Sequence, residues 1–586
     1  YANEGGSYAL SHTHTTQENL YLAANLNYQI NKDWEVHGFL REEYFNQYAQ
    51  YNSESTNGGL IVPNQFFIKN SKQQASFNAY KFNTKRIVST IFMIGTSWKN
   101  QLFLDITGRN DWSSALVYSY GTGNFSYFYP SVSGSWIITE TFKDKLPKWV
   151  SFAKVRGSWA QVGNDTSPYY INSGYSVATY QRGDKKIYGM TIPENMKSTN
   201  LKPERKNAWE VGLDWRFLDS RIGVDLTYYK ENTRNQIMTI NVPWESGVKE
   251  KLINAGNIQN SGIEIALNTT PIKKKQWQWD LNFTYTRNRN KIVELSPDVT
   301  SYINLDGAAN YGNYRIASVA KVGSDYGMLM SDSWIKTDEK TGKPVVGYTN
   351  KFRTVYYKRG GTVKEVGSML PNFLGSLNST LRWKDLSLYV LFDARFGGYV
   401  ASYNSRYATA YGFSGETEKY RKGMTWTSKY ANAQDKVFTD GFIPDVVFDA
   451  GTIVTTPGGT NQDVSGMTYQ EAYEKGYVEP AHLQSAAYFK NSWGTGVIND
   501  DWFKKINYIA LREITLSYNV PTKISSYIGA KNLSLSFTGR NLAYLLNTAP
   551  NHENPESVRG TGAAQFRMRS FMPYTASYLF TLNATF

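Results

Sequence analysis

One sequence feature constrains the fold of this chain more than any other: apolar and polar residues alternate in many separate segments. In 386–395, Leu, Leu, Val, Phe and Ala alternate with Ser, Tyr, Leu, Asp and Arg, and 222–229, 514–520 and 533–538 follow the same rule. Successive side chains of a β-strand point to opposite faces. Each segment is therefore predicted to be a strand with one apolar face and one polar, often charged face, which favours an all-β protein.

The connections between these segments alternate between short and long. Short turns are predicted at 31–33, 99–100, 218–220, 271–275 and 384–385, with two somewhat longer connections near 140–149 and 520–530. Long polar stretches lie between them, at 49–85, 113–129, 163–204, 239–256, 293–370, 400–505 and 545–573. Short periplasmic turns and long extracellular loops are typical of transmembrane antiparallel β-barrels of the outer membrane.

Counting the alternating segments gives about fifteen strands. They are predicted at 17–30, 34–48, 86–98, 101–112, 130–139, 150–162, 205–217, 221–238, 257–270, 276–292, 371–383, 386–399, 506–519, 531–544 and 574–586. A bacterial barrel normally has an even number of strands and begins and ends on the periplasmic side. We therefore expect at least one further strand upstream, with residues 1–16 as the tail of an extracellular loop. In a transporter barrel of about 22 strands with a plugged lumen, these would be strands 8 to 22, and 1–586 would be the C-terminal part of the barrel domain, without the plug.

The composition agrees with a membrane barrel. Aromatic residues make up 15% of the chain, and no segment approaches the roughly 18 apolar residues of a membrane-spanning helix. A mean hydropathy of −0.49 still fits a barrel, because only every second strand residue faces lipid. A soluble propeller or β-helix would also alternate, but it would repeat regularly and have an apolar interior face. Neither property is present, so the predicted location is the outer membrane.

The same composition offers little for catalysis or metal binding. The chain has no cysteine and five histidines. His12 and His14 could share a strand face, but no carboxylate cluster lies near them, and a cation site at 551–556 has no further support. The net charge of +14 comes from Lys and Arg scattered over turns and loops, which predicts contact with lipid headgroups rather than nucleic acid. We therefore expect no enzyme, no metal site and no cofactor.

Two groups of residues are candidates for substrate binding. Arg109, Asp111 and Trp112 lie where a predicted strand meets its extracellular loop, so Trp112 could stack on a sugar while the charged pair binds hydroxyl groups. The favoured alternative is structural: Asp111 caps a turn, Arg109 forms an ion pair, and Trp112 anchors the strand at the membrane interface.

The second group consists of Tyr389, Asp393 and Arg395 on the polar face of one predicted strand. These side chains could line an import path. A solvated wall or a contact with the plug is the favoured alternative, because wide barrels have polar interiors in any case.

The long loops are stronger candidates as a group than any single residue. The largest are predicted at 163–204, 293–370 and 400–505, and loops of this length are usually functional. The last two carry many aromatic residues, which suit both ligand stacking and a protein interface. These are Tyr302, Tyr311, Tyr314, Tyr356, Tyr399, Tyr403, Tyr407, Tyr411, Trp426, Tyr430 and Trp493.

Several ordered motifs carry a family resemblance. They are GRNDWSS at 108–114, YPSVSGSW at 129–136, LKPE at 201–204 before EVGLD at 210–214, NAGNIQNSGIE at 254–264, LREITLSY at 511–518 and TGRNL at 538–542. The last strand alternates and stops on Phe586, which resembles the signal read by outer-membrane barrel assembly machinery. Together these motifs resemble the C-terminal part of the SusC/RagA family of TonB-dependent outer-membrane transporters.

The resemblance implies energy-dependent import. A plug domain with a TonB box would couple the barrel to an inner-membrane motor, and a SusD-like lipoprotein would cap the extracellular mouth. A dimer of such complexes is a further option that the resemblance leaves open. The usual cargo of the family is an oligosaccharide, and some members take peptides, so a peptide importer stays open. An outer-membrane adhesin or structural barrel without transport is the alternative from another class.

Overall fold

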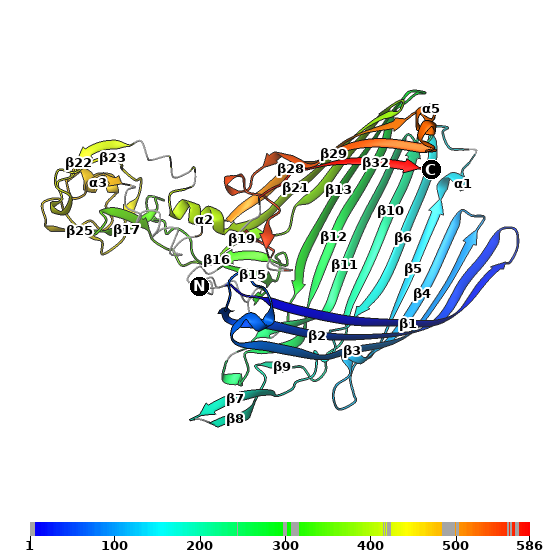
Figure 1. Ribbon diagram of the computed structural model, residues 1–586, viewed down its shortest axis with the longest axis horizontal. Coiled ribbons are helices and arrows are strands. Elements are labelled where there is room, and N and C mark those ends of the chain that lie inside the picture. Colours follow the sequence, from blue (N-terminus) through cyan, green and yellow to red (C-terminus); the bar gives the residue numbers. More distant parts are fainter. Residues whose placement is uncertain are drawn as a thin grey trace. The chain divides into compact units, whose positions relative to one another are not determined.

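The computed structural model describes residues 6–586, apart from 144, 184, 243, 297–301, 306–315, 414, 416–417, 419–422, 483–498, 500–502, 560–561, 563–564 and 569–572. Strands dominate this part of the chain (Figure 1). No helix in the described ranges has the length and apolar character needed to span a membrane.

Fifteen of the described strands have nine residues or more, and each coincides with one predicted strand. They are β1 (Ala9–Gln29), β2 (Trp34–Leu60), β3 (Ser71–Trp98), β4 (Leu102–Ser113), β5 (Ser126–Ile137), β6 (Val150–Asn164), β10 (Glu204–Phe217), β11 (Ile222–Asn241), β12 (Glu250–Lys273), β13 (Trp277–Glu294), β20 (Phe373–Trp383), β21 (Leu386–Ser402), β28 (Phe503–Val520), β29 (Asn532–Asn547) and β32 (Ser577–Thr585). The all-β prediction is confirmed.

Some strands are longer than the alternation indicates, and the prediction was wrong there. The strand β1 begins at Ala9, within the stretch assigned to a loop tail, and the long loop predicted at 49–85 contracts to the segment between Leu60 and Ser71. The backbone ladder between β2 and β3 continues to the Leu60–Ser71 pair through several bulges. A strand needs an alternating apolar face only where one face is buried or meets lipid, so polar ends of this kind escape a search for alternation.

The chain divides into two compact units. In the first unit, β1 to β6 pair antiparallel with their neighbours in chain order, and β6 pairs with β10. In the second unit, β13, β20, β21, β28, β29 and β32 form a similar antiparallel series. The strands β11 and β12 contribute residues to both units, as do the last two residues of β13.

Tight turns join several of these strands, as predicted. Between β3 and β4, Lys99 and Asn100 have φ values of 50° and 52°, and the Gln101 N–H donates to the Trp98 carbonyl oxygen at 2.9 Å. Two consecutive left-handed residues are typical of the type I′ turn, whose twist matches that of the flanking strands. The register of this hairpin therefore fixes which side chains share a face.

Shorter elements lie in the connections. In the first unit they are η1 (Ile68–Asn70), η2 (Ser114–Leu116), α1 (Ile138–Thr141), β7 (Ser176–Arg182), β8 (Lys185–Thr191), β9 (Asn195–Lys197) and η3 (Trp244–Ser246). In the second unit the strands are β14 (Tyr302–Asn304), β15 (Ile316–Lys321), β16 (Met328–Ser331), β17 (Val345–Thr349), β18 (Thr354–Tyr357), β19 (Lys364–Ser368), β22 (Met424–Thr427), β23 (Val437–Phe442), β24 (Val447–Phe448), β25 (Ile453–Thr455), β26 (Asn461–Asp463), β27 (Ala481–His482), β30 (Val558–Arg559) and β31 (Arg567–Met568). Its helices are α2 (Tyr403–Ala410), η5 (Ala431–Ala433), α3 (Tyr469–Glu474), α5 (Thr522–Ser525), η7 (Ser526–Ile528) and η8 (Pro550–His552).

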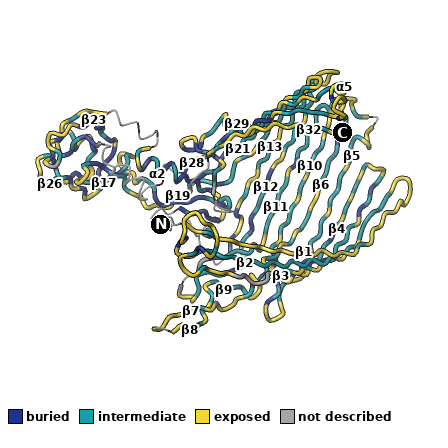
Figure 2. Tube along the Cα trace, in the orientation of Figure 1, coloured by how far each residue is buried: buried dark blue, intermediate teal, exposed yellow. Residues whose placement is uncertain are grey.

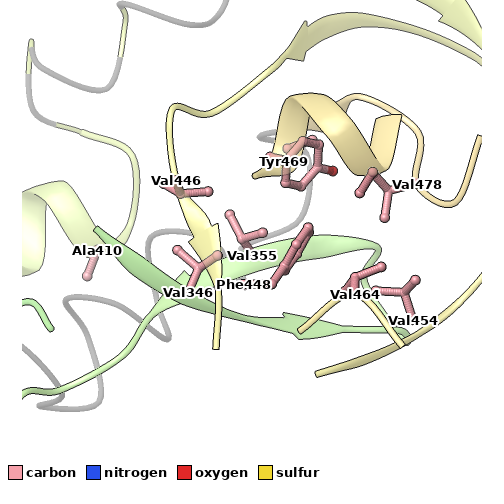
Figure 3. Close-up of a cluster of buried hydrophobic side chains, with 11 residues drawn as sticks. Val346, Val355, Ala410, Val446, Phe448, Val454, Val464, Tyr469 and Val478 are labelled. Carbon is pink, nitrogen blue, oxygen red and sulfur yellow. The ribbon is translucent and has the colours of Figure 1, made fainter. Parts of the chain in front are cut away.

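Two loops that are far apart in the sequence build one folded piece in the second unit. The strand β17 pairs in parallel with β24, so Val345 lies beside Val447 and Val346 beside Phe448. Around this pair the side chains converge on a closed apolar cluster (Figure 3). We call this cluster the loop core, and it consists of Val346, Val355, Ala410, Val446, Phe448, Val454, Val464, Tyr469, Ala472, Val478 and Ala481.

Candidate functional site on the polar face of the strands

The long strands have one exposed apolar face and one polar face. On β4, Leu102, Leu104 and Ile106 are 42–44% exposed, whereas the alternate residues are half-buried. The opposite face carries hydroxyl and amide ladders, such as Thr515–Thr538 at 2.9 Å and Asn282–Asn378 at 2.7 Å. Figure 2 shows that buried residues concentrate in the connections rather than along these strands. This pattern is typical of strands that meet lipid on one side and a polar interior on the other.

Aromatic residues mark two levels on the apolar face. In the first unit, Trp98 pairs with Leu102 at the tight turn, and Trp112 stands ten residues further along β4 on the same face. In the second unit, Trp383 and Phe373 bound β20 and are also ten residues apart. Ten residues of a strand tilted by roughly 45° rise about 23 Å, close to the apolar band of about 25 Å between the two aromatic girdles of membrane barrels.

The first candidate group divides between the two faces. The Arg109 Nε donates to Asp111 Oδ1 at 2.7 Å, and its Nη2 donates to Ser89 Oγ at 2.9 Å. The Tyr129 hydroxyl donates to the other Asp111 oxygen. Trp112 points to the apolar face, where it is 39% exposed. The structure therefore joins Arg109 and Asp111 in one polar cluster and leaves Trp112 outside it.

A second acidic residue extends this cluster toward the loop after β6. Asp165 accepts a hydrogen bond from Ser113 Oγ and lies 2.5 Å from Lys85 Nζ. Both charged side chains are largely buried, with 19% exposure for Lys85 and 8% for Asp165. Together these contacts hold the start of the loop against the middle of β3 and the end of β4, which indicates a structural contribution.

In the second unit, Asp393 belongs to a charged network. The Arg512 guanidinium donates to Asp393 Oδ2 at 2.6 Å and forms a bidentate pair with Glu556 at 2.6 and 2.7 Å. The Tyr544 hydroxyl donates to Glu556 at 2.8 Å, and Tyr508 lies 3.3 Å from the same carboxylate. Burial raises the pKa of the Glu556 carboxyl, but the Arg512 and Tyr544 hydrogen bonds outweigh it and leave that pKa below its usual value.

The other two residues of the second candidate group, Arg395 and Tyr389, lie at different positions along β21. Arg395 faces Tyr508 across the β21–β28 ladder, and its guanidinium donates to the carbonyl oxygens of Gly397 and Met369 at 3.3 and 3.2 Å. Tyr389 pairs with Thr515, several residues nearer the turn at 384–385. Asp393 and Arg395 thus lie close to one cluster, whereas Tyr389 contributes to the wall below it.

Sequence reasoning missed the residues that complete this network. Arg512 lies at a bulge, because Leu391 pairs with Glu513 while Phe392 pairs with Leu511. The segment 551–556, considered above for a cation, instead supplies Glu556 to Arg512. Its neighbour Glu553 is buried and accepts from Ser402 Oγ at 3.2 Å, and burial raises its pKa. No group of three or more metal-ligating side chains lies among the described residues.

The aromatic loop residues differ in burial. Tyr403 and Tyr430 are buried, whereas Tyr407 and Tyr411 on or just after α2 stack at 6.4 Å and are 43% and 58% exposed. Tyr311, Tyr314 and Trp493 lie outside the described residues. Among the described loop residues, fewer aromatic side chains are therefore exposed to a ligand or partner than the number of aromatic loop residues in the sequence indicates.

Comparison with known proteins supplies the family. The model of the TonB dependent receptor-like beta-barrel matches residues 1–350. TonB-dependent receptor P26 of Formosa agariphila is 23% identical over 486 residues, which cover 81% of this chain and 43% of that protein. SusC of Bacteroides thetaiotaomicron is 27% identical over 270 residues, which cover 44% of this chain and 26% of that protein.

The fold agrees with a solved structure of the same type. The RagAB peptide transporter superposes with a TM-score of 0.71 at 16% identity, covering 99% of this chain and 56% of that chain. The chain spans less than half the length of the curated relatives named above. Because the family model matches more than half of the chain and the strands adopt the corresponding fold, this chain belongs to the TonB-dependent receptor β-barrel family of the outer membrane and is of the SusC/RagA type.

Proposed function

We propose that the chain is the C-terminal barrel part of a SusC-like, TonB-dependent importer of oligosaccharides. The family, the similarity to SusC and the fold support active import across the outer membrane. The proposed partners are a SusD-like surface lipoprotein that covers the extracellular mouth, the TonB complex acting through a plug, and a possible dimer of the transporter–lipoprotein pair.

The observation that carries the choice of cargo is the mutual pairing of charges on the polar face. Asp111 is bonded to Arg109, and Asp393 and Glu556 are bonded to Arg512. Beside the Arg512 pairs lies the half-buried Tyr544, whose ring packs against the buried ring of Tyr508. Hydroxyl partners and aromatic faces suit a neutral, polyhydroxylated cargo, because sugars present both hydroxyl groups and apolar C–H faces.

In the proposed mechanism, the lipoprotein closes over the cargo at the extracellular end. The charged network of the second unit then holds its hydroxyl groups through Asp393, whose bond with Arg512 keeps the carboxylate oriented. The motor withdraws the plug, and the cargo passes along the hydroxyl ladders of the strand wall. The ladders offer many exchangeable partners of similar strength, which favours movement over tight retention.

The test is uptake and binding of labelled oligosaccharides by the complete gene product with its partner lipoprotein. We expect Asp393→Asn to weaken oligosaccharide binding about tenfold. Phe392→Ala, on the opposite face of the same strand as Asp393, is the matched control and should bind as the wild type does. Uptake at the full rate in a strain that lacks the TonB motor would contradict the importer proposal.

A peptide cargo is the second candidate, and one observation favours it. Arg395 is held by two backbone carbonyl oxygens, and no carboxylate lies within ion-pair distance of it in the described residues. Such a guanidinium could donate hydrogen bonds to a peptide carboxylate. Competition between peptides and oligosaccharides for the purified complex separates the two cargoes, and Arg395→Gln should reduce binding of peptides only.

A further inference from the structure

A row of basic residues stands on the apolar face of β13, beyond its last aromatic residue. Arg287, Arg289 and Lys291 follow Tyr285 at intervals of two, so all four share one face of the strand. The other face is the polar one, where Thr284 bonds Ser376 at 2.6 Å. The three basic side chains therefore point outward, away from the hydroxyl and amide ladders.

The position of this row relative to the membrane follows from its aromatic neighbours. The Tyr285 ring lies 5.3 Å from Phe373, and Phe373 stacks on Phe396 at 4.8 Å. These rings mark the upper aromatic level on the outward face. Each pair of residues adds about 5 Å of height on a tilted strand, so Arg287 to Lys291 span roughly the first 5–14 Å above that level, which is the headgroup region.

The charge of this row is not compensated within the described part of the chain. No ion pair there involves Arg287, Arg289 or Lys291, whereas the basic residue Arg382 on the polar face bonds Asp280 at 2.8 Å. The nearest acidic residues of the strand, Asp280 and Glu294, alternate to the other face. Arg289 and Lys291 are exposed and Arg287 is half-buried, so three positive charges face outward without a carboxylate.

The same order recurs in the first unit. Trp209 contacts Tyr228 at 5.4 Å on the apolar face, and Lys230 and Arg234 continue that face of β11. The acidic residue between them, Glu231, alternates to the polar face and pairs there with Lys206. An aromatic level followed by outward basic residues thus occurs independently in both units.

We propose that the outward face of β13 above Tyr285 is a binding site for the phosphate groups of anionic lipids in the outer leaflet. Guanidinium groups bind phosphate oxygens in a bidentate manner, and each basic side chain near an anionic surface adds to the attraction. Aromatic rings at the level below hold the strand at a fixed depth, so the charges meet headgroups rather than acyl chains. The acidic surface of a protein partner would not require this fixed depth directly above an aromatic level.

The experiment compares lipid binding by the complete gene product and its variants. The probe is bis-phosphorylated lipid A in mixed detergent micelles, and its dephosphorylated form is the second probe, both followed by native mass spectrometry. We expect the triple variant Arg287→Gln, Arg289→Gln, Lys291→Gln to bind the phosphorylated lipid at least tenfold more weakly than the wild type. Binding of the dephosphorylated lipid should be equal for both proteins, and added salt should weaken only the phosphate-dependent part.

The matched control is the triple variant Lys273→Gln, Lys274→Gln, Lys275→Gln. It removes the same charge from the same hairpin at the short-turn end, and it should retain wild-type lipid affinity. Equal losses of lipid affinity in both variants, or no loss in the β13 variant, would overturn the proposal. It would also be overturned if the free bis-phosphorylated glucosamine disaccharide, which has no acyl chains, bound with the same affinity as the lipid. Heat-modified gel mobility reports folding, and the single variant Arg289→Gln replaces the triple variant if the latter does not fold.

Discussion

The second unit contains two regions that obey different rules of stability. In the loop core, Val346, Phe448 and Tyr469 are at most 1% exposed and pack on one another (Figure 3). On the last strand, β32, almost every side chain is exposed, including Phe580 at 71%. The loop core excludes water with its own residues, as a small water-soluble domain does. The strand relies on backbone pairing with its neighbour and on a lipid environment for its apolar face.

This contrast predicts which part of the second unit a substitution should destabilise. A cavity in the loop core removes contacts that no lipid can replace, so it should destabilise the loops without unpairing the strands. A change in the charged network at the strand ends should act on the junction between strands and loops. The predictions below test this separation, beginning with the largest effect.

The largest effect is expected for Phe448→Ala. Phe448 lies 5.4 Å from the Tyr469 ring and 6.2 Å from that of Tyr348, and truncation of a buried Phe usually costs about 3–5 kcal/mol. Hydrogen exchange should show amides of 446–478 exchanging much faster, while amides of β28 and β29 keep their protection.

The control for this cavity is Phe413→Ala, which removes the same ring from a residue that is 85% exposed. It should leave exchange in both regions unchanged. If Phe448→Ala accelerates exchange in β28 to the same degree as in 446–478, the loop core and the strands unfold as one unit and the contrast is wrong.

A smaller effect is expected for Arg512→Met. The variant leaves Asp393 and Glu556 facing each other without their common partner, but both carboxylates are more than one-third exposed. Solvent screening therefore reduces the loss, which we expect to be about 1–2 kcal/mol in the free energy of unfolding. Denaturant titration of the folded species measures it, with Arg540→Met as the control, because Arg540 is 54% exposed in its pair with Glu513 and should lose less than about 0.5 kcal/mol.

The same network predicts a pH dependence with a definite sign. The pKa of Glu556 is lower in the folded protein than its usual value of 4.5, so the folded state favours the ionised carboxylate. Its contribution is complete above pH 4.5 and is lost as the pH falls through the folded-state pKa. The stability difference between the wild type and Arg512→Met should therefore shrink below pH 4.5, and a constant difference down to pH 3 would contradict the assignment.

These regions also differ in how far the sequence predicts them. The long strands followed from alternation because each has to present an apolar face to lipid. The same alternation, which the grouping of Arg109, Asp111 and Trp112 did not use, puts Arg109 and Asp111 together on the polar face. The same parity puts Trp112 on the apolar face, and grouping it with its two neighbours ignored that rule.

Register and long-range pairing could not be predicted. Arg512 reaches Asp393 because β28 has one extra residue at that point. The sequence shows this bulge only as a change of phase in the alternation between Leu511 and Ile514, which does not indicate which residue of another strand Arg512 faces. The loop core depends on a parallel pairing between Val345 and Val447, which lie in different loops on either side of β20 and β21. Short apolar runs in two separate loops do not indicate that they meet.

The smallest effect concerns the short helix α3, which contributes Tyr469 and Ala472 to the loop core. The Thr468 hydroxyl accepts from the Glu471 N–H at 3.2 Å, and the Glu471 carboxylate accepts from the Thr468 N–H at 2.9 Å. These two hydrogen bonds form a capping box that fixes the first turn and so positions Tyr469. Thr468→Ala should cost about 1 kcal/mol locally, seen as faster exchange confined to 469–476, whereas Thr468→Ser keeps the cap and should behave as the wild type. Faster exchange that extends to Val346 would mean that α3 has to form before the rest of the loop core can pack, and the six-residue helix would then be a condition for that core rather than a result of it.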